Sequence, residues 1–286
     1  MTFDSGAHWR NLHRDPSLRA VGQSGLPLEL NRWLYRAGRR NVIAFVRRAG
    51  LFVPPPSTVL DVGAGSGYWS RTWLELGAGS VAVNDLVEDA VERLQASFPG
   101  ALTFLGDIRD AGVLPDDESY DFVSVMNVLL HITDEPGFDQ AVHHIAGAVR
   151  PGGHVLLAEA ALRRPWQGPQ TPPDAASRPR TIERYRTAFA AAGLRLVAVG
   201  PSAVVAANPI DASTPGRLRW MSRAWGAIGR AAWVHPILAK ALGIMLDTAD
   251  RVLMRTGASP SGKLMVMEKP GPALTDSAKI DRAPDT

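Results

Sequence analysis

Three glycines and one acid form the part of this sequence that is best suited to binding a ligand. Gly63, Gly65 and Gly67 follow Asp61 at the end of a short apolar segment, residues 58–62, that is typical of a buried strand. A turn from a buried strand into a helix presents backbone N–H groups and a helix N-terminus to a ligand, and residues without side chains let that ligand approach closely. Because many nucleotide-binding folds and some structural turns use glycines in this way, the pattern alone predicts a ligand-binding turn without naming the ligand.

The spacing of the glycines narrows the choice of ligand. A dinucleotide fingerprint needs a third glycine where this chain has Tyr68, and a P-loop needs a Gly-Lys-Ser or Gly-Lys-Thr sequence that the turn lacks. The carboxylate of Asp61 would repel a pyrophosphate, but it could hold an amino group or order water beside a cationic ligand. A sulfonium amino acid therefore fits the turn better than a dinucleotide.

Two further acids end the next two expected strands. Asp85 follows Asn84, where a carboxylate can accept both hydroxyls of a ribose, and Asp107 follows the third strand, where it can accept the exocyclic amine of an adenine. Ile108 offers an apolar edge to the same ring. Since the carboxyl ends of parallel strands meet in one crevice, we expect these acids and Asp61 to face a common site.

Strands and helices alternate along the chain, which predicts a mostly parallel sheet covered by helices on both faces. The expected strands are residues 58–62, 80–83, 102–105, 120–126, 154–158, 194–199 and 263–268. We expect the last of them, residues 263–268, at an edge of the sheet.

The chain is expected to divide into five parts. These are a helical cap at 1–53, a cofactor-binding core at 54–200, a helical insertion or lid at 201–259, the last core strand at 260–270 and a disordered tail at 271–286. The insertion carries Trp220, Trp225 and Trp233, which predict either a lid over an apolar acceptor pocket or a helical pair packed on the sheet. Arginines beside these tryptophans are also compatible with an anionic membrane surface. Prolines and glycines interrupt the segment, which favours the lid.

Composition limits the class of protein. The chain has 286 residues, 45% of them hydrophobic and 21% charged, which is typical of one globular domain with additions. The absence of cysteine excludes disulfides, thiolate zinc sites and a cysteine nucleophile, and no metal is expected. No signal-like segment or membrane-length apolar run is found, so a soluble, cytoplasmic protein is expected. The net charge of +3 comes without a dense basic run, so we expect no nucleic-acid partner.

These motifs together resemble the class I, Rossmann-like family of S-adenosylmethionine-dependent methyltransferases over about residues 57–160. The resemblance rests on residues 59–67, 83–85, 106–108, 120–121, 126–127 and 149–153. It implies a seven-stranded sheet with a reversed last hairpin and S-adenosylmethionine as cofactor. The residues expected at the cofactor are Asp61, Gly63, Ala64, Gly65, Gly67, Asp85, Leu86, Asp107, Ile108, Met126 and Asn127. In relatives an N-terminal helix folds over the cofactor, so an aromatic or arginine near Trp33 or Tyr35 could touch the methionine end; core packing of the same aromatics is an equal alternative.

Methyl transfer is an in-line displacement, so the protein mainly has to align the acceptor with the methyl donor. His131, shortly after the fourth strand, is the best-placed general base for a hydroxyl acceptor, and its alternative role is to anchor a helix by hydrogen bonding. We expect O-methylation of a small molecule such as a secondary metabolite or a sugar-like compound. A catalytically inactive cofactor-binding scaffold and an NAD-dependent oxidoreductase are the alternatives. The sequence leaves the oligomeric state open.

Overall fold

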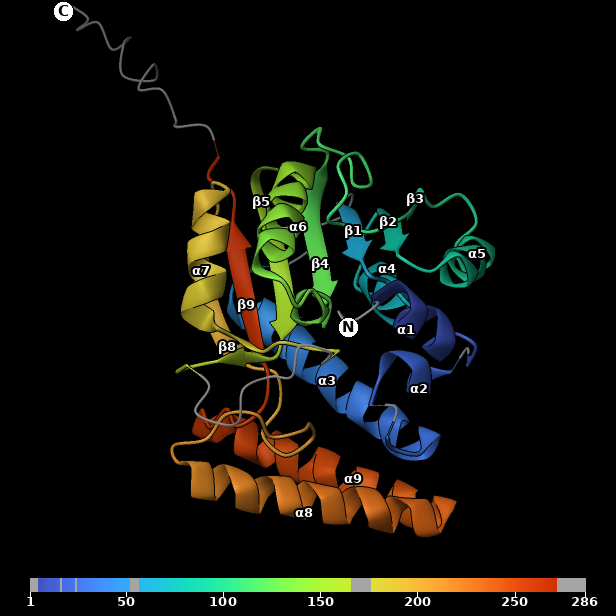
Figure 1. The fold of residues 1–286 in the computed structure, drawn as a ribbon, viewed down its shortest axis with the longest axis vertical. Helices are drawn as coiled ribbons and strands as arrows, with labels where there is room; N and C mark the ends of the chain where they lie inside the picture. Colours follow the sequence, from blue (N-terminus) through green and yellow to red (C-terminus); the bar gives the residue numbers. More distant parts are fainter. Residues whose placement is uncertain (1–4, 16, 24, 52–56, 166–175, 272–286) are drawn as a thin grey trace, which may run out of the picture.

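The computed structural model describes residues 5–271 except 16, 24, 52–56 and 166–175. A seven-stranded sheet forms its centre, in the order β3-β2-β1-β4-β5-β9-β8 (Figure 1). The strands are β1 (Thr58–Val62), β2 (Ser80–Asp85), β3 (Thr103–Leu105), β4 (Tyr120–Met126), β5 (Val149–Glu159), β8 (Arg195–Pro201) and β9 (Lys263–Glu268). A separate two-stranded pair joins β6 (Ala161–Leu162) to β7 (Arg180–Thr181). The expected Rossmann-like, mostly parallel sheet is confirmed.

Helices occupy both faces of the sheet and extend beyond it. They are α1 (Ser5–Leu12), α2 (Leu18–Val21), α3 (Leu28–Arg48), α4 (Tyr68–Glu75), α5 (Glu88–Ser97), α6 (Glu135–Ala148), α7 (Ile182–Ala191), α8 (Pro215–Val234) and α9 (Pro236–Leu253), with short 3-10 turns η1 (Leu129–His131) and η2 (Met254–Thr256). The expected N-terminal helices and the helical insertion before the last strand are therefore present. None of the helices described is long and apolar enough to cross a membrane.

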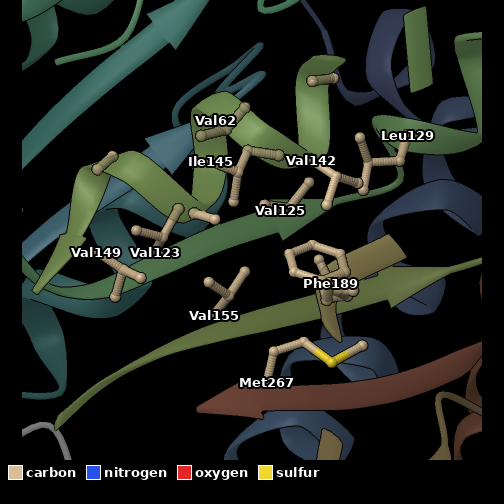
Figure 2. Close-up of a cluster of buried hydrophobic side chains, with 14 of the residues drawn as sticks. Val62, Val123, Val125, Leu129, Val142, Ile145, Val149, Val155, Phe189 and Met267 are labelled. Carbon is tan, nitrogen blue, oxygen red and sulfur yellow. The ribbon is translucent and has the colours of Figure 1, made fainter. Parts of the chain in front are cut away.

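The hydrophobic core lies on the two faces of the sheet. On one face, α6 and α7 pack on β1, β4, β5 and β9 through buried side chains such as Val125, Ile145, Phe189 and Met267 (Figure 2). On the other face, α3, α4 and α5 cover the sheet around the fully buried Trp73. Because strands buried on both faces must be apolar throughout, the continuous valine and leucine runs of β1, β4 and β5 form the centre of the sheet.

The last strand lies inside the sheet, so our expectation of an edge strand is wrong. β9 pairs antiparallel with β5 on one side and β8 on the other. Residues 264–267, Leu-Met-Val-Met, are fully buried, which a continuous apolar run favours and an edge does not. The edge is instead β8, whose alternating pattern leaves Val197 and Val199 exposed. The reversed last hairpin is confirmed.

A third layer lies beyond α3, where α8 and α9 pack side by side (Figure 1). The two helices are continuous, because Pro215 and Pro236 each lie in the first turn of a helix, where proline is tolerated. The segment does break at Pro236, between the two helices, as expected for a proline, whereas the glycines within α8 and α9 do not interrupt them. Gly243 is needed for packing, since a Cβ there would lie 2.5 Å from Trp33 Cγ. The five-part division of the chain stays a prediction, and residues 272–286 of the expected tail lie outside the described residues.

Candidate cofactor and acceptor site

The glycine turn after β1 has the conformation that a close ligand approach requires. Gly63, Gly65 and Gly67 all have positive φ values, of 63°, 56° and 72°. A Cβ on Gly63 would lie 2.5 Å from Val128 Cγ2, and one on Gly65 would lie 2.6 Å from Val21 Cγ1. A side chain at either position would be strained and would clash with Val128 or Val21, so only glycine lets these valines pack against the turn while its backbone lines the cleft.

The parallel register of β1, β2, β3 and β4 brings their carboxyl ends to one cleft. Of the site residues expected from the sequence, ten line this cleft: Gly63, Ala64, Gly65, Asp85, Leu86, Asp107, Ile108, Met126, Asn127 and His131. Asp61 and Gly67 do not line it. Within the described residues, no group of three or more His, Asp or Glu side chains is arranged to hold a metal ion.

Asp61 lies within β1, the strand expected from the sequence, but it does not line the cleft, so our expectation that it faces a common site with Asp85 and Asp107 is wrong. The side chain is buried, and its Oδ2 accepts a 2.6 Å hydrogen bond from the Ser70 hydroxyl of α4. Burial raises the pKa of Asp61 to about 6. This carboxyl group therefore links β1 to α4, the helix that follows the glycine turn. Gly67 has a packing role, because a Cβ there would lie 2.6 Å from Phe98 Cε2.

Asp85 connects the end of β2 to the glycine turn. Its Oδ2 accepts the Gly65 N–H at 2.8 Å, and its Oδ1 accepts the Val87 N–H at 3.0 Å. His13, which follows α1, faces this carboxylate from above, and burial lowers the pKa of the imidazole although the charge of Asp85 opposes that shift. The carboxylate is thus held in place by backbone donors and still borders the cleft.

Asp107 is paired with an arginine that the sequence did not single out. Arg109 Nη2 lies 2.6 Å from Asp107 Oδ2, and Arg109 Nε lies 3.0 Å from both carboxylate oxygens. Burial alone would raise the pKa of Asp107, but the hydrogen bonds and charge of Arg109 outweigh it and hold this pKa below its usual value. Any adenine amine that Asp107 accepts must therefore share the carboxylate with Arg109.

Asn127 and His131 are positioned by a buried acid at the end of β5. Glu159 accepts the N–H groups of three consecutive residues, Val128, Leu129 and Leu130, at 3.0, 2.9 and 3.1 Å. The same turn holds Asn127 at a φ of 60°, an uncommon value for a residue other than glycine. Burial raises the pKa of Glu159 to about 7. Sequence reasoning missed this residue because it is distant along the chain from the turn that it holds.

His131 lines the cleft, and its hydrogen bond fixes the tautomer of a neutral imidazole. Its Nδ1 lies 2.6 Å from the carbonyl oxygen of Ala176. Since a carbonyl only accepts hydrogen bonds, Nδ1 carries the proton and Nε2 keeps a lone pair. Burial lowers the pKa of His131, which favours this neutral form. The Trp9 ring packs edge-on against the imidazole, with centroids 4.7 Å apart.

The N-terminal helices contribute an aromatic wall to the cleft. Tyr35 lines it, as expected for a residue of this segment, and its ring lies edge-on to Tyr68 at 4.8 Å. Trp9 and Val21 also line it, although the sequence did not single them out, because α1 and α2 are too short to show a hydrophobic period. Trp33 packs against α9 instead. No described residue between 201 and 259 lines this cleft, so the lid role expected for the insertion stays a prediction.

Comparison with known proteins agrees with this geometry. Residues 59–153 match the model of a methyltransferase domain family. Over 156 residues the chain is 28% identical to a malonyl-[acyl-carrier protein] O-methyltransferase from Methylococcus capsulatus, a match that covers 52% of this chain. It covers 53% of the relative, so the chain matches about half the length of that protein.

Several solved structures share the fold. One is assigned as a sarcosine dimethylglycine methyltransferase from Galdieria sulphuraria, with a TM-score of 0.53, 15% identity, and 82% of this chain and 85% of that chain covered. Another is a SAM-dependent methyltransferase from Leishmania major, with a TM-score of 0.54, 18% identity, and 68% and 74% covered. A third is the [4+2]-cyclase SpnF, with a TM-score of 0.50, 16% identity, and 82% and 81% covered. At these identities the likeness concerns the fold alone.

The sheet order, with its antiparallel β9 and a strand-end cleft behind a glycine turn, defines a Rossmann-like protein of the methyltransferase type. With the methyltransferase domain matched over residues 59–153, this architecture supports a class I S-adenosylmethionine-dependent methyltransferase.

Proposed function

We propose that this chain transfers the methyl group of S-adenosylmethionine to an oxygen atom of a small-molecule acceptor. The observation that carries the proposal is the single cleft that joins the glycine cradle, Asp85 and Asp107 to the neutral imidazole of His131. The two halves of a methyl transfer, cofactor binding and acceptor activation, would then share one site. S-adenosylmethionine would supply a methyl group already activated by the positive sulfur.

The residues present fit such a cofactor. The backbone of Gly63 and Gly65 lines the cleft without side chains, and it suits the methionine end. Asp85, held by backbone donors, has carboxylate oxygens suited to ribose hydroxyls, and Asp107 with Ile108 suits the adenine. The methyltransferase domain matched over residues 59–153, together with the resemblance to class I S-adenosylmethionine-dependent methyltransferases, supports the assignment.

His131 is proposed as the base that accepts the proton of an acceptor hydroxyl at Nε2. Its Nδ1–H is bonded to Ala176, so the ring keeps one tautomer and one orientation. The adjoining Trp9 gives the acceptor side of the cleft an apolar surface, which suits a moderately apolar metabolite. The relative from Methylococcus capsulatus is named for O-methylation, which supports oxygen as the acceptor atom.

The first test is calorimetric titration of the protein with S-adenosylmethionine and, separately, with NAD. We expect saturable binding of S-adenosylmethionine in the micromolar range and no binding of NAD. Binding of NAD without S-adenosylmethionine would overturn the proposal in favour of an oxidoreductase. The second test follows labelled methyl transfer to a panel of hydroxylated and carboxylated metabolites, and binding without transfer to any of them would favour the inactive scaffold.

A further inference from the structure

The outer face of the α8–α9 hairpin is unusually apolar for a surface. Most of the large hydrophobic side chains that are exposed in the described chain belong to these two helices. The most exposed are Val234, Ile237 and Trp220, with 76%, 72% and 69% of their surface accessible. Single exposed apolar residues are ordinary, but a continuous group of them marks an interaction site.

The exposed residues of α9 form a stripe opposite its packed side. Ile237, Ile244 and Val252 are exposed, at intervals of seven and eight residues, which places them on one helix face. Ala239, Gly243 and Leu246, on the other face, are buried against the rest of the protein. Figure 1 shows the hairpin beyond α3, with α9 next to α3 and α8 outermost, and the exposure of the three side chains places the stripe on a part of the α9 surface that neither helix covers.

The charges on this hairpin have one sign wherever they are exposed. Helix α8 contains no acid, and the two acids of α9, Asp247 and Asp250, are buried beside Arg40. The exposed cations of the hairpin are Arg217, Arg219, Arg223, Arg230, Lys240 and Arg251, of which Arg251 pairs with buried Asp247, and Arg255 follows in η2. Exposed apolar side chains among exposed cations, with tryptophan at the boundary, are the composition of a helix that lies in the interface of an anionic bilayer.

We propose that the α8–α9 hairpin is a docking face for an anionic membrane surface. The apolar stripe would enter the headgroup region while the arginines contact lipid phosphates. A second copy of this chain suits the face less well, because a two-fold contact would bring like-charged arginines together. The bilayer supplies both the apolar layer and the negative charge that this face lacks.

The hairpin is also bonded to the segment that leads into the cofactor cleft. Trp233 Nε1 donates to the Gly25 carbonyl at 2.9 Å, and Trp225 Nε1 donates to Gln23 Oε1 at 3.3 Å. These acceptors follow directly after Val21, which lines the cleft. A docked hairpin would therefore hold residues 21–23 and 25, which lead from the cleft lining to the hairpin, close to the lipid surface.

The test is co-sedimentation of the full chain with vesicles of phosphatidylglycerol and phosphatidylcholine, and with vesicles of phosphatidylcholine alone. We expect binding to the anionic vesicles only, released by high salt. The variant R223S/R230S is expected to weaken this binding about 30-fold, the fold-change for two basic residues at about 1 kcal/mol each. The variant I237S/I244S is expected to weaken it as well, at unchanged charge.

The matched control is R47S/R48S, which removes two exposed arginines of α3 outside the hairpin. It is expected to bind anionic vesicles within about threefold of the unchanged protein, since arginine charge counts only within a Debye length of the lipid. Thermal unfolding of each variant checks the fold. The proposal is overturned by any of three results: no sedimentation with anionic vesicles, an equal loss in the control, or self-association that I237S/I244S abolishes without vesicle binding.

Discussion

Two distant regions of this molecule share one arrangement, a buried carboxylate that accepts hydrogen bonds from three consecutive backbone N–H groups. In the cofactor cleft, buried Glu159 accepts three consecutive backbone N–H groups from residues 128–130. In the α8–α9 hairpin, buried Asp250 accepts three more from residues 204–206, at 2.7, 2.9 and 3.3 Å. Asp250 is also contacted by Arg40 and Asn41, whereas no ion pair to Glu159 is present among the described residues. The hairpin acid has the partners of a structural anchor, and the cleft acid lacks a cation.

This difference separates stability from function. A buried carboxylate that contacts a cation and several hydrogen-bond donors stabilises one packing arrangement. Its removal leaves those buried donors without this acceptor. A buried carboxylate without a cation changes its protonation near neutral pH, beside the residues proposed for catalysis. Loss of the hairpin acid should therefore change unfolding without changing cofactor binding, whereas variants of the cleft should change binding, turnover or the pH dependence of unfolding.

The largest effect is expected from Asp250→Ala. The substitution leaves three backbone N–H groups without their acceptor and removes one of the two acids that Arg40 contacts, so the free energy of unfolding should fall by about 3–5 kcal/mol. Urea unfolding measures this change, and Thr248→Ala, an exposed position on the same helix, is the control. Affinity of the folded protein for S-adenosylmethionine should stay unchanged. A weaker affinity would contradict the separation of the two regions.

His131→Gln should lower kcat by about 100-fold or more, the usual contribution of a general base. Because burial lowers the pKa of His131 from its usual value, kcat/KM of the unchanged protein should rise with pH, with its midpoint below that usual value. The variant should lose this dependence while its affinity for the cofactor stays unchanged. If His131 is only an anchor, the rate would instead recover in the glutamine variant relative to alanine.

Asp85→Ala should weaken binding of S-adenosylmethionine by roughly 10–100-fold, because it removes hydrogen bonds to charged oxygens. The loss of the bond to Gly65 N–H would also loosen the glycine turn. Calorimetry measures the affinity, with Glu92→Ala on the exposed face of α5 as control. Equal affinity of the two variants for S-adenosylmethionine would mean that Asp85 does not contact the cofactor.

Glu159→Gln tests the cleft acid through pH. The folded-state pKa of about 7 lies above the usual value of 4.5, so the folded protein binds more protons between these values. Stability from this group is therefore complete at acid pH and falls as pH rises through 7, by up to about 3 kcal/mol. The stability advantage of the unchanged protein over the variant should shrink from pH 5 to pH 8, measured by urea unfolding at each pH. A constant advantage would mean that Glu159 keeps one protonation state.

Arg109→Gln should have the smallest effect. The arginine side chain is 37% exposed, so loss of its ion pair with Asp107 should change the free energy of unfolding by less than about 1 kcal/mol. Because Asp107 would no longer be shared, the affinity for S-adenosylmethionine should rise by up to about threefold. Asp107→Ala, as the opposing variant, should lower it.

Local patterns predicted most of the cleft. The apolar run of β1, the glycines after it and the acids at the ends of β2 and β3 lie on short continuous segments, so their type and spacing indicate both the sheet and its ligand edge. Parallel pairing then brings those ends together wherever the helices lie. For this reason ten of the expected site residues line one cleft.

The sequence by itself determined the class of fold, the cleft-lining turn and the acids at the strand ends, because these depend on hydrophobic period and on neighbours in the chain. Only the tertiary structure decided which groups meet across long separations: Glu159 under the turn of His131, Trp9 against the imidazole, and Arg109 over Asp107. It also placed β9 inside the sheet and Asp61 beneath the turn. Such contacts follow from packing of the whole chain, and no local spacing records them.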